Sequence, residues 1–276
     1  MKLHRKWNIW ELLRILVLTI AALIIVFPFF WMIISSFKTD QEVLSKDVFW
    51  PTTWHPENYV AAWNRGEFEV YFANSILMSL TMVGGQIITS AMAAYAFAKQ
   101  KFKLNKPLFM VFLATMMIPG EATLVSNYLT ISSLGLMDTF AAVVLPGMVS
   151  VFGVFLLRQF YMTIPDALTE AAKIDGAGEI TTFTRIILPL GKSAMASIAI
   201  IGFIGAWNSY LWPLIITNSP RLRTIQTGLN AMRNLDQGVD WNELNAMSAM
   251  VTIPVLILFA ALQKYFVQGI TKVGLK

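Results

Sequence analysis

The chain has 276 residues, of which 56% are hydrophobic and only 13% are charged, and its formal net charge is +5. Soluble globular domains contain about 25% charged residues, so this chain has too few to cover a surface in water. The composition excludes intrinsic disorder, which needs low hydrophobicity and high charge, and argues against a soluble enzyme. Because there is no cysteine, disulfides, thiol catalysis and cysteine-ligated metal are excluded as well.

Six long apolar segments are predicted to cross a membrane, which takes about 20 mainly apolar residues for each helix. All are predicted to be helical, because a helix satisfies its own backbone hydrogen bonds in lipid. The first follows four basic residues, but it is too long for a signal peptide and no cleavage site follows it. The second is interrupted by Gly84 and Gly85, and the third by Pro119-Gly120-Glu121. The predicted spans are residues 15–34, 72–97, 108–129, 140–157, 194–216 and 246–262.

The charged residues divide between the two sides of these spans. Of the 21 Lys and Arg residues, 15 lie in segments 1–14, 98–107, 158–193 and 263–276. The acidic residues fall mainly in the alternate segments. Because Lys and Arg accumulate in cytoplasmic loops, both termini are predicted to be cytoplasmic, and the net charge requires no nucleic-acid partner. No repeat or linker divides the chain, so residues 1–276 are predicted to form a single transmembrane domain.

The segment 158–193 is the longest predicted cytoplasmic loop, and it is electrically neutral among basic ones. Pro165 suits the first turn of a helix and Asp166 its positive end, whereas Gly176 suits the residue after its C-terminus. A second short helix is predicted over residues 179–187, after which Leu188-Pro189 turns the chain back towards the fifth span. Two short, rigid helices beneath a membrane can dock in a groove of another protein.

This loop resembles the EAA loop of the permease subunits of binding-protein-dependent ABC importers. Glu170-Ala171-Ala172 is followed after three residues by Gly176, with Asp175 and Ala177 beside it, and later by Leu188-Pro189. The stretches TTFTRIILPL, FIGAWNSYLWPLIITNSPRLRT and QKYFVQGIT resemble the carbohydrate-uptake subfamily, in particular the smaller, maltose-type second permease. The resemblance covers almost the whole chain, from FWMIISSFKT in the first span to the C-terminal tail.

The resemblance implies a type I ABC importer permease fold in the bacterial cytoplasmic (inner) membrane. In this family the loop is a coupling helix that sits in a cleft of one subunit of a cytoplasmic ATPase dimer. The ATPase binds ATP and Mg, whereas the permease chain has no cofactor of its own. The family usually combines two different permeases as a heterodimer that opens alternately to each side, and an extracytoplasmic binding protein delivers the substrate.

The resemblance also assigns roles within the loop. Glu170 is implied as the polar contact to the ATPase, Ala171 and Ala172 as residues that allow close approach, and Gly176 as the residue that permits the turn. The expected coupling set contains, besides these four, Asp175, Ala177, Leu188 and Pro189.

The substrate implied by the resemblance is a mono- or oligosaccharide, and glycerol phosphate or another polyol derivative stays open. The alternative function of a different class is an ion-coupled secondary transporter. Such proteins tend to show internal repeats and intramembrane ionisable residues.

Gly191-Lys192-Ser193 looks like the end of a P-loop, but Ile186 stands where such a loop needs glycine, so no nucleotide site is predicted. Neither a catalytic cluster nor a metal site is predicted.

Two polar residues of the predicted spans are candidates for lining a pathway. Glu121 is predicted at or near membrane depth, where an acid is by default a functional candidate. An interfacial, solvated position suits Glu121 equally well. Asn208 lies within the fifth predicted span, and it either lines the pathway or hydrogen-bonds to a neighbouring helix.

Overall fold

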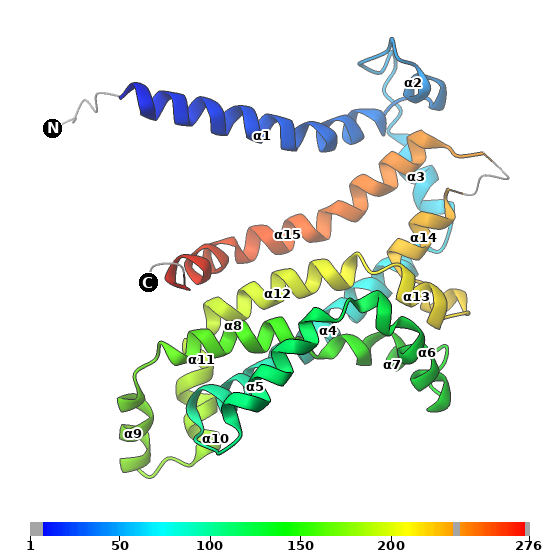
Figure 1. The fold of residues 1–276 in the computed structure, drawn as a ribbon. Helices are drawn as coiled ribbons and strands as arrows, with labels where there is room; N and C mark the ends of the chain where they lie inside the picture. The colour runs from blue at the N-terminus through cyan, green and yellow to red at the C-terminus, as the bar shows by residue number, and fades with distance from the viewer. Residues whose placement is uncertain (1–7, 234–237, 274–276) are drawn as a thin grey trace. The chain divides into compact units, whose positions relative to one another are not determined.

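The computed structural model describes residues 8–233 and 238–273, which form helices and connecting segments without a β-strand (Figure 1). The principal helices are α1 (Ile9–Ser35), α2 (Asp40–Leu44), α3 (Glu57–Asn64), α4 (Phe68–Lys99), α5 (Asn105–Ala114), α6 (Leu124–Ser133), α7 (Phe140–Val144), α8 (Val151–Met162), α9 (Asp166–Ile174), α10 (Glu179–Thr182), α11 (Leu188–Leu190), α12 (Lys192–Trp207), α13 (Leu211–Ile216), α14 (Ile225–Ala231) and α15 (Trp241–Val273). The predicted all-helical membrane protein is therefore confirmed.

Four helical stretches are long and apolar enough to cross a membrane: Ile9–Ser35, Phe68–Lys99, Phe140–Met162 and Trp241–Tyr265. In two further places, a pair of neighbouring helices is long and apolar enough to cross a membrane only when the two helices are counted together. Asn105–Met117 and Gly120–Ser133 are bent by 95°, and Glu179–Leu190 and Lys192–Trp207 by 73°. Up to six spans result if each bent pair counts as one.

Contacts divide the chain into two compact units, residues 1–67 with 229–253 and residues 68–228 with 254–276. That residues 1–276 form one membrane domain stays a prediction. In the first unit, the buried Asn58 donates hydrogen bonds to the carbonyls of Ser36 and Lys38 at 2.9 and 2.8 Å. Both carbonyls follow the end of α1, so the amide satisfies buried backbone groups of the turn after the helix.

The second unit is organised around α4, which packs along both α8 and α12 (Figure 1). Small side chains at the contact allow the helices to approach closely, as is typical of membrane helices. Ala91 and Ala94 of α4 and Ala194 of α12 are all at most 3% exposed. The same core contains Tyr95, Phe109, Val154, Leu157, Tyr161, Ile164, Ile187 and Ile198.

The fourth predicted span is broken between α7 and α8, where Pro146 lies in a turn of 3-10 helix over Leu145–Met148. Side chains of α4 donate to the carbonyls at this break. Gln86 Nε2 lies 2.7 Å from the Gly147 oxygen, and Thr89 Oγ1 lies 3.0 Å from the Met148 oxygen. Because a bare carbonyl in hydrocarbon costs several kcal/mol, these two side chains make a broken span tolerable there.

Two details of the predicted spans are wrong. The second span is not interrupted, because α4 continues through Gly84 and Gly85 as one helix. Gly85 instead allows a close approach, since a Cβ atom there would lie 2.6 Å from the side chain of Met148. The fifth span is not continuous, because α12 ends at Trp207 and Asn208 follows as its C-cap. Short polar side chains such as asparagine compete with helical backbone bonds, which explains the break.

The contact between α4 and α8 predicts that Gly153→Ala destabilises the protein. The new Cβ would meet the Ser90 hydroxyl and lie 3.3 Å from the Ser150 Cβ atom. We expect the free energy of unfolding to fall by about 1–3 kcal/mol, as for other overpacked cores. Thermal unfolding in detergent measures the change.

The control is Gly84→Ala on α4, because no atom lies within 4 Å of the Cβ position there. Equal melting temperatures for the two variants would contradict the close packing of α4 against α8.

Candidate functional site

The EAA segment forms one short helix that ends in a left-handed glycine turn. Pro165 precedes α9, and Asp166 occupies its first turn. After the helix, Gly176 has a φ of +78°, a conformation that glycine adopts without a steric penalty. The Ala177 N–H donates to the Ala172 carbonyl at 2.9 Å, which closes the turn. The predicted helix and its glycine stop are therefore found in the structure.

The second half of the loop is helical for longer than predicted. α10 continues through a π-helical turn at Phe183–Ile187 into α11, where Pro189 lies within the first turn. The predicted reversal at Leu188-Pro189 is wrong in position, because the helix that begins at Glu179 continues through both residues. The chain bends by 73° between Leu190 and Lys192 instead. Gly191 is buried there, and a Cβ atom would lie 2.9 Å from the Tyr161 ring.

Lys99, the last residue of α4, fastens the start of the loop. Its side chain is only 5% exposed, and its Nζ donates to the Ile164 carbonyl and to Asp166 Oδ1, each at 2.6 Å. This hydrogen bond, together with the positive charge of Lys99, lowers the pKa of the Asp166 carboxyl below its ordinary value. Asp166 therefore stays ionised at the positive end of α9, where a negative charge is favourable.

Glu179, the first residue of α10, fastens the second half of the loop to the same end of α4. Its Oε2 accepts hydrogen bonds from Tyr95 and Gln100, both at 2.7 Å. Its Oε1 pairs with Lys173 of α9 at 3.1 Å. One carboxylate therefore joins α4, α9 and α10, and the sequence reasoning did not identify it. The available signal was its position directly after the glycine turn, where an acid also suits a helix N-terminus.

The sequence-predicted coupling residues divide into exposed and packed positions. Glu170 and Ala171 are exposed, as are Asp175 and Gly176, whereas Ala172 is 4% exposed and packs inside the loop. Ala177 and Leu188 are half-buried, and Pro189 is exposed. Nothing in the described part of the chain bonds to the Glu170 side chain.

Large apolar side chains are exposed beside Glu170. Ile174 lies four residues after it on the same helical face and is 86% exposed. Ile180 on α10 is 80% exposed. An exposed face of this kind, carrying both apolar groups and an unpaired acid, is typical of a protein–protein contact.

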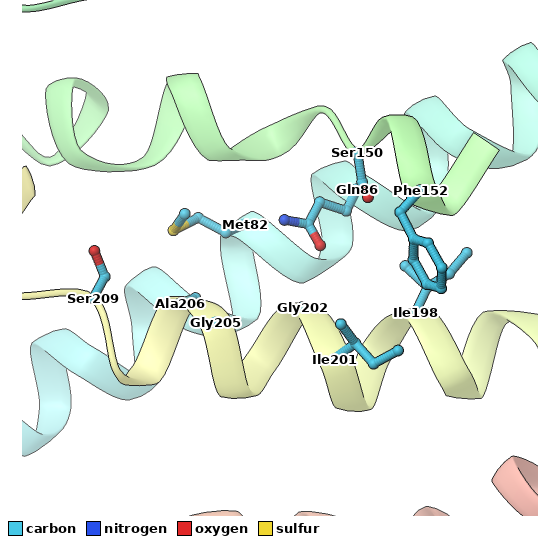
Figure 2. Close-up of a pocket in the computed structure, with 10 residues that line it drawn as sticks. All are labelled: Met82, Gln86, Ser150, Phe152, Ile198, Ile201, Gly202, Gly205, Ala206 and Ser209. Atoms are coloured by element: carbon cyan, nitrogen blue, oxygen red, sulfur yellow. The ribbon is translucent and has the colours of Figure 1, made fainter. Parts of the chain in front are cut away.

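A second candidate site is a cavity of about 290 Å³ among α4, α8 and α12 (Figure 2). Figure 2 shows Met82 and Gln86 of α4 between α12 and the stretch of chain that leads from α7 into α8. The cavity combines an apolar lining with three polar side chains, as ligand sites usually do. Its lining residues are Met82, Gln86, Ser150, Phe152, Ile198, Ile201, Gly202, Gly205, Ala206 and Ser209.

Neither polar residue predicted for the pathway lines this cavity. Asn208 is exposed, and its Oδ1 accepts a hydrogen bond from Gln226 at 3.3 Å, which matches the alternative of bonding to a neighbouring helix. Glu121 is exposed in the 3-10 turn between α5 and α6. Gln86 was missed, although a lone amide in the middle of an apolar span is the available signal.

Substitution of Glu179 and substitution of Glu170 are expected to affect the rigidity of the loop differently. Glu179→Ala removes three contacts that join α4, α9 and α10, so we expect faster hydrogen exchange of backbone amides over residues 174–182. Mass spectrometry of the exchanged peptides measures this in the isolated chain.

Glu170→Ala is the matched control, because it is an exposed glutamate in the same loop and we expect no change in exchange. Equal acceleration in both variants would show that Glu179 does not hold the loop.

Comparison with known proteins identifies the family of the chain. The family model described as "Binding-protein-dependent transport system inner membrane component" matches residues 86–272. The probable ABC transporter permease protein YurM of Bacillus subtilis (strain 168) is 34% identical over 278 residues, which cover 100% of this chain and 92% of YurM. The sn-glycerol-3-phosphate transport system permease protein UgpE of Rhizobium meliloti (strain 1021) is 34% identical, covering 97% of this chain and 98% of UgpE.

A solved structure has the same fold. It is the crystal structure of a bacterial ABC transporter involved in the import of the acidic polysaccharide alginate, with a TM-score of 0.83 and 23% identity. The match covers 96% of this chain and 99% of that one. The resemblance seen in the sequence is confirmed: the chain belongs to the family of binding-protein-dependent transport system inner membrane components, the non-catalytic, multi-pass permeases of ABC importers.

Proposed function

We propose that this chain is one of two different permease subunits of an ATP-driven importer for a sugar or a polyol derivative. A cytoplasmic ATPase dimer would bind ATP and Mg, and an extracytoplasmic binding protein would deliver the substrate. The relatives' names support the substrate class, because they concern sn-glycerol-3-phosphate transport and the import of a polysaccharide. Glycerol phosphate and polysaccharides are both rich in oxygen atoms. Because the two names point to different substrates, they do not decide between the sugar and the glycerol phosphate alternative.

The observation that carries the coupling role is the contrast between Glu170 and Glu179. Glu179 is bonded to three other residues within the chain, whereas the side chain of Glu170 projects from the loop unbonded within the described residues. A carboxylate fixed on a short helix beside exposed Ile174 is suited to an apolar cleft with a cationic or hydrogen-bonding group. We infer that this cleft belongs to the ATPase, which places α9 and both termini in the cytoplasm.

The cavity at Gln86 is proposed as part of the substrate pathway. Its polar groups are the amide of Gln86 and the hydroxyls of Ser150 and Ser209, and such groups form hydrogen bonds with polyhydroxylated ligands. At about 290 Å³ the cavity is at the small end of ligand sites. A second permease would supply the other wall of the pathway.

The ion-coupled alternative makes a different prediction about energy supply. Uptake by an importer of this kind should stop when ATP is depleted, even if the ion gradients are kept. Uptake that persisted under those conditions would support a secondary transporter instead. Membership of the binding-protein-dependent family supports the ATP-driven function.

The coupling role predicts that Glu170→Lys combined with Gly176→Val abolishes uptake. The first change reverses the charge offered to the ATPase, and the second strains the turn, because valine is disfavoured at a φ of +78°. We expect ATPase subunits to co-purify more weakly while the permease still inserts in the membrane. Substrate uptake and co-purification are the two measurements.

Gly178→Val provides the control, since Gly178 has a φ of −68° in the same loop and no atom lies within 4 Å of its Cβ position. Normal transport by the double variant would refute the coupling assignment.

The pathway role predicts which engineered cysteines react with a water-soluble thiol reagent. The natural chain has no cysteine, so each variant carries a single reactive group. Gly205→Cys places the thiol in the cavity, where its Cβ has room, and we expect it to be labelled in the assembled importer. Saturating substrate and binding protein should slow this labelling.

Ile204→Cys is the neighbouring control, because Ile204 does not line the cavity. Labelling of Gly205→Cys that substrate does not slow would contradict the assignment of the cavity to the pathway.

A further inference from the structure

An open pocket of about 700 Å³ lies where the chain passes from α4 into α5 and meets the end of α8. Four of its lining side chains are cationic, namely Lys101, Lys103, Lys106 and Arg158. None is acidic, although the segment 158–193, which begins with Arg158, carries four acids. The remaining lining residues are Gln100, Phe102, Asn105 and Pro107.

The cations of the pocket come from two separate parts of the chain. The three lysines lie where α4 passes into α5, whereas Arg158 lies on a helix more than 50 residues away in the sequence. Its Nε donates to the carbonyl of Phe97 at 3.3 Å, and its guanidinium lies 4.0 Å from the centre of the Phe109 ring. These contacts hold the guanidinium at the wall of the pocket. Within the described residues, no carboxylate lies within 4 Å of any of the four cations.

One of the four cations does sense a carboxylate from a distance. The positive charge of Lys101 contributes weakly to the lowered pKa of Asp166, whose direct partner is Lys99. The pocket as a whole therefore has a strong excess of positive charge. Four cations that line one pocket, none of them in an ion pair within the described residues, are suited to a phosphate group, and arginine in particular binds phosphate with two parallel hydrogen bonds.

An apolar helix face continues from this pocket. Leu104, Leu108 and Val111 recur at the spacing of one face of a helix, and they are 59%, 48% and 67% exposed. A free phosphate would use the cations alone, whereas a phospholipid would place its headgroup among the cations and an acyl chain along this face. The combination of both surfaces favours the lipid.

We propose that this pocket binds the headgroup of an anionic phospholipid of the cytoplasmic leaflet. Basic pockets between membrane helices on that side are suited to such lipids, which are attracted by about 1 kcal/mol for each Lys or Arg near the surface. The proposal rests on the cytoplasmic placement of residues 98–107 but not on the transported substrate. A lipid bound here would lie beside Gln100, which also holds Glu179 of the coupling loop.

The test uses the purified, delipidated importer and phosphatidylglycerol titrated in detergent micelles. Native mass spectrometry counts the bound lipid, with phosphatidylcholine as the zwitterionic probe and inorganic phosphate as the competitor. We expect phosphatidylglycerol to bind more tightly than phosphatidylcholine, and phosphate not to displace it. Arg158→Gln should weaken binding roughly fivefold, and Lys103→Gln with Lys106→Gln roughly 25-fold.

The matched control neutralises two exposed cations outside the pocket, Arg14→Gln with Lys264→Gln, and should bind as the natural protein does. Arg158→Lys keeps the charge, so partial loss of affinity in that variant would support a fitted site. Equal binding of both lipids, equal loss in the control, or displacement by inorganic phosphate would overturn the proposal.

Discussion

Backbone carbonyls without a helical partner cannot be left bare in a lipid bilayer, and α4 carries the side chains that satisfy them. The bond from Gln86 to the Gly147 carbonyl and the bond from Thr89 to the Met148 carbonyl both lie at the break between α7 and α8. Ser150, which follows this break, lines the cavity of Figure 2 together with Gln86. The side chain that satisfies a backbone carbonyl at the break therefore also supplies a polar group to the cavity proposed as part of the pathway.

The same helix ends at the coupling loop, which links the two candidate sites physically. Gln86 lines the cavity, and Lys99 at the end of α4 holds the start of α9. Thirteen residues of helix separate these two positions, which corresponds to about 20 Å. A hydrogen-bonded helix transmits a displacement over that distance with little change in length. If the ATPase contacts Glu170 as proposed, its movement would reach the cavity through α4.

The sequence predicted the parts of this arrangement that depend on local patterns. The length of the apolar segments indicated the spans. Pro165 and Gly176 indicated the two ends of α9, because helix caps and left-handed turns depend on residues that are neighbours in the sequence. Long-range partners could not be predicted in this way. Nothing near Glu179 indicates that Tyr95 will reach it, and nothing near Pro146 indicates that Gln86 will satisfy the carbonyl beside it. Asn208 was a reasonable candidate by polarity, but the helix breaks at that residue and its side chain meets Gln226.

The exposed face of α9 is proposed to contact the ATPase. Because the chain has no cysteine, a photoreactive group can be attached to a single cysteine placed at position 170 on this face, or at the exposed position 121 between α5 and α6 as a control. Illumination of the assembled importer should capture the ATPase from position 170 and not from position 121. Capture from position 121 alone, or no capture from position 170 in a complex that still contains the ATPase, would contradict the proposed contact.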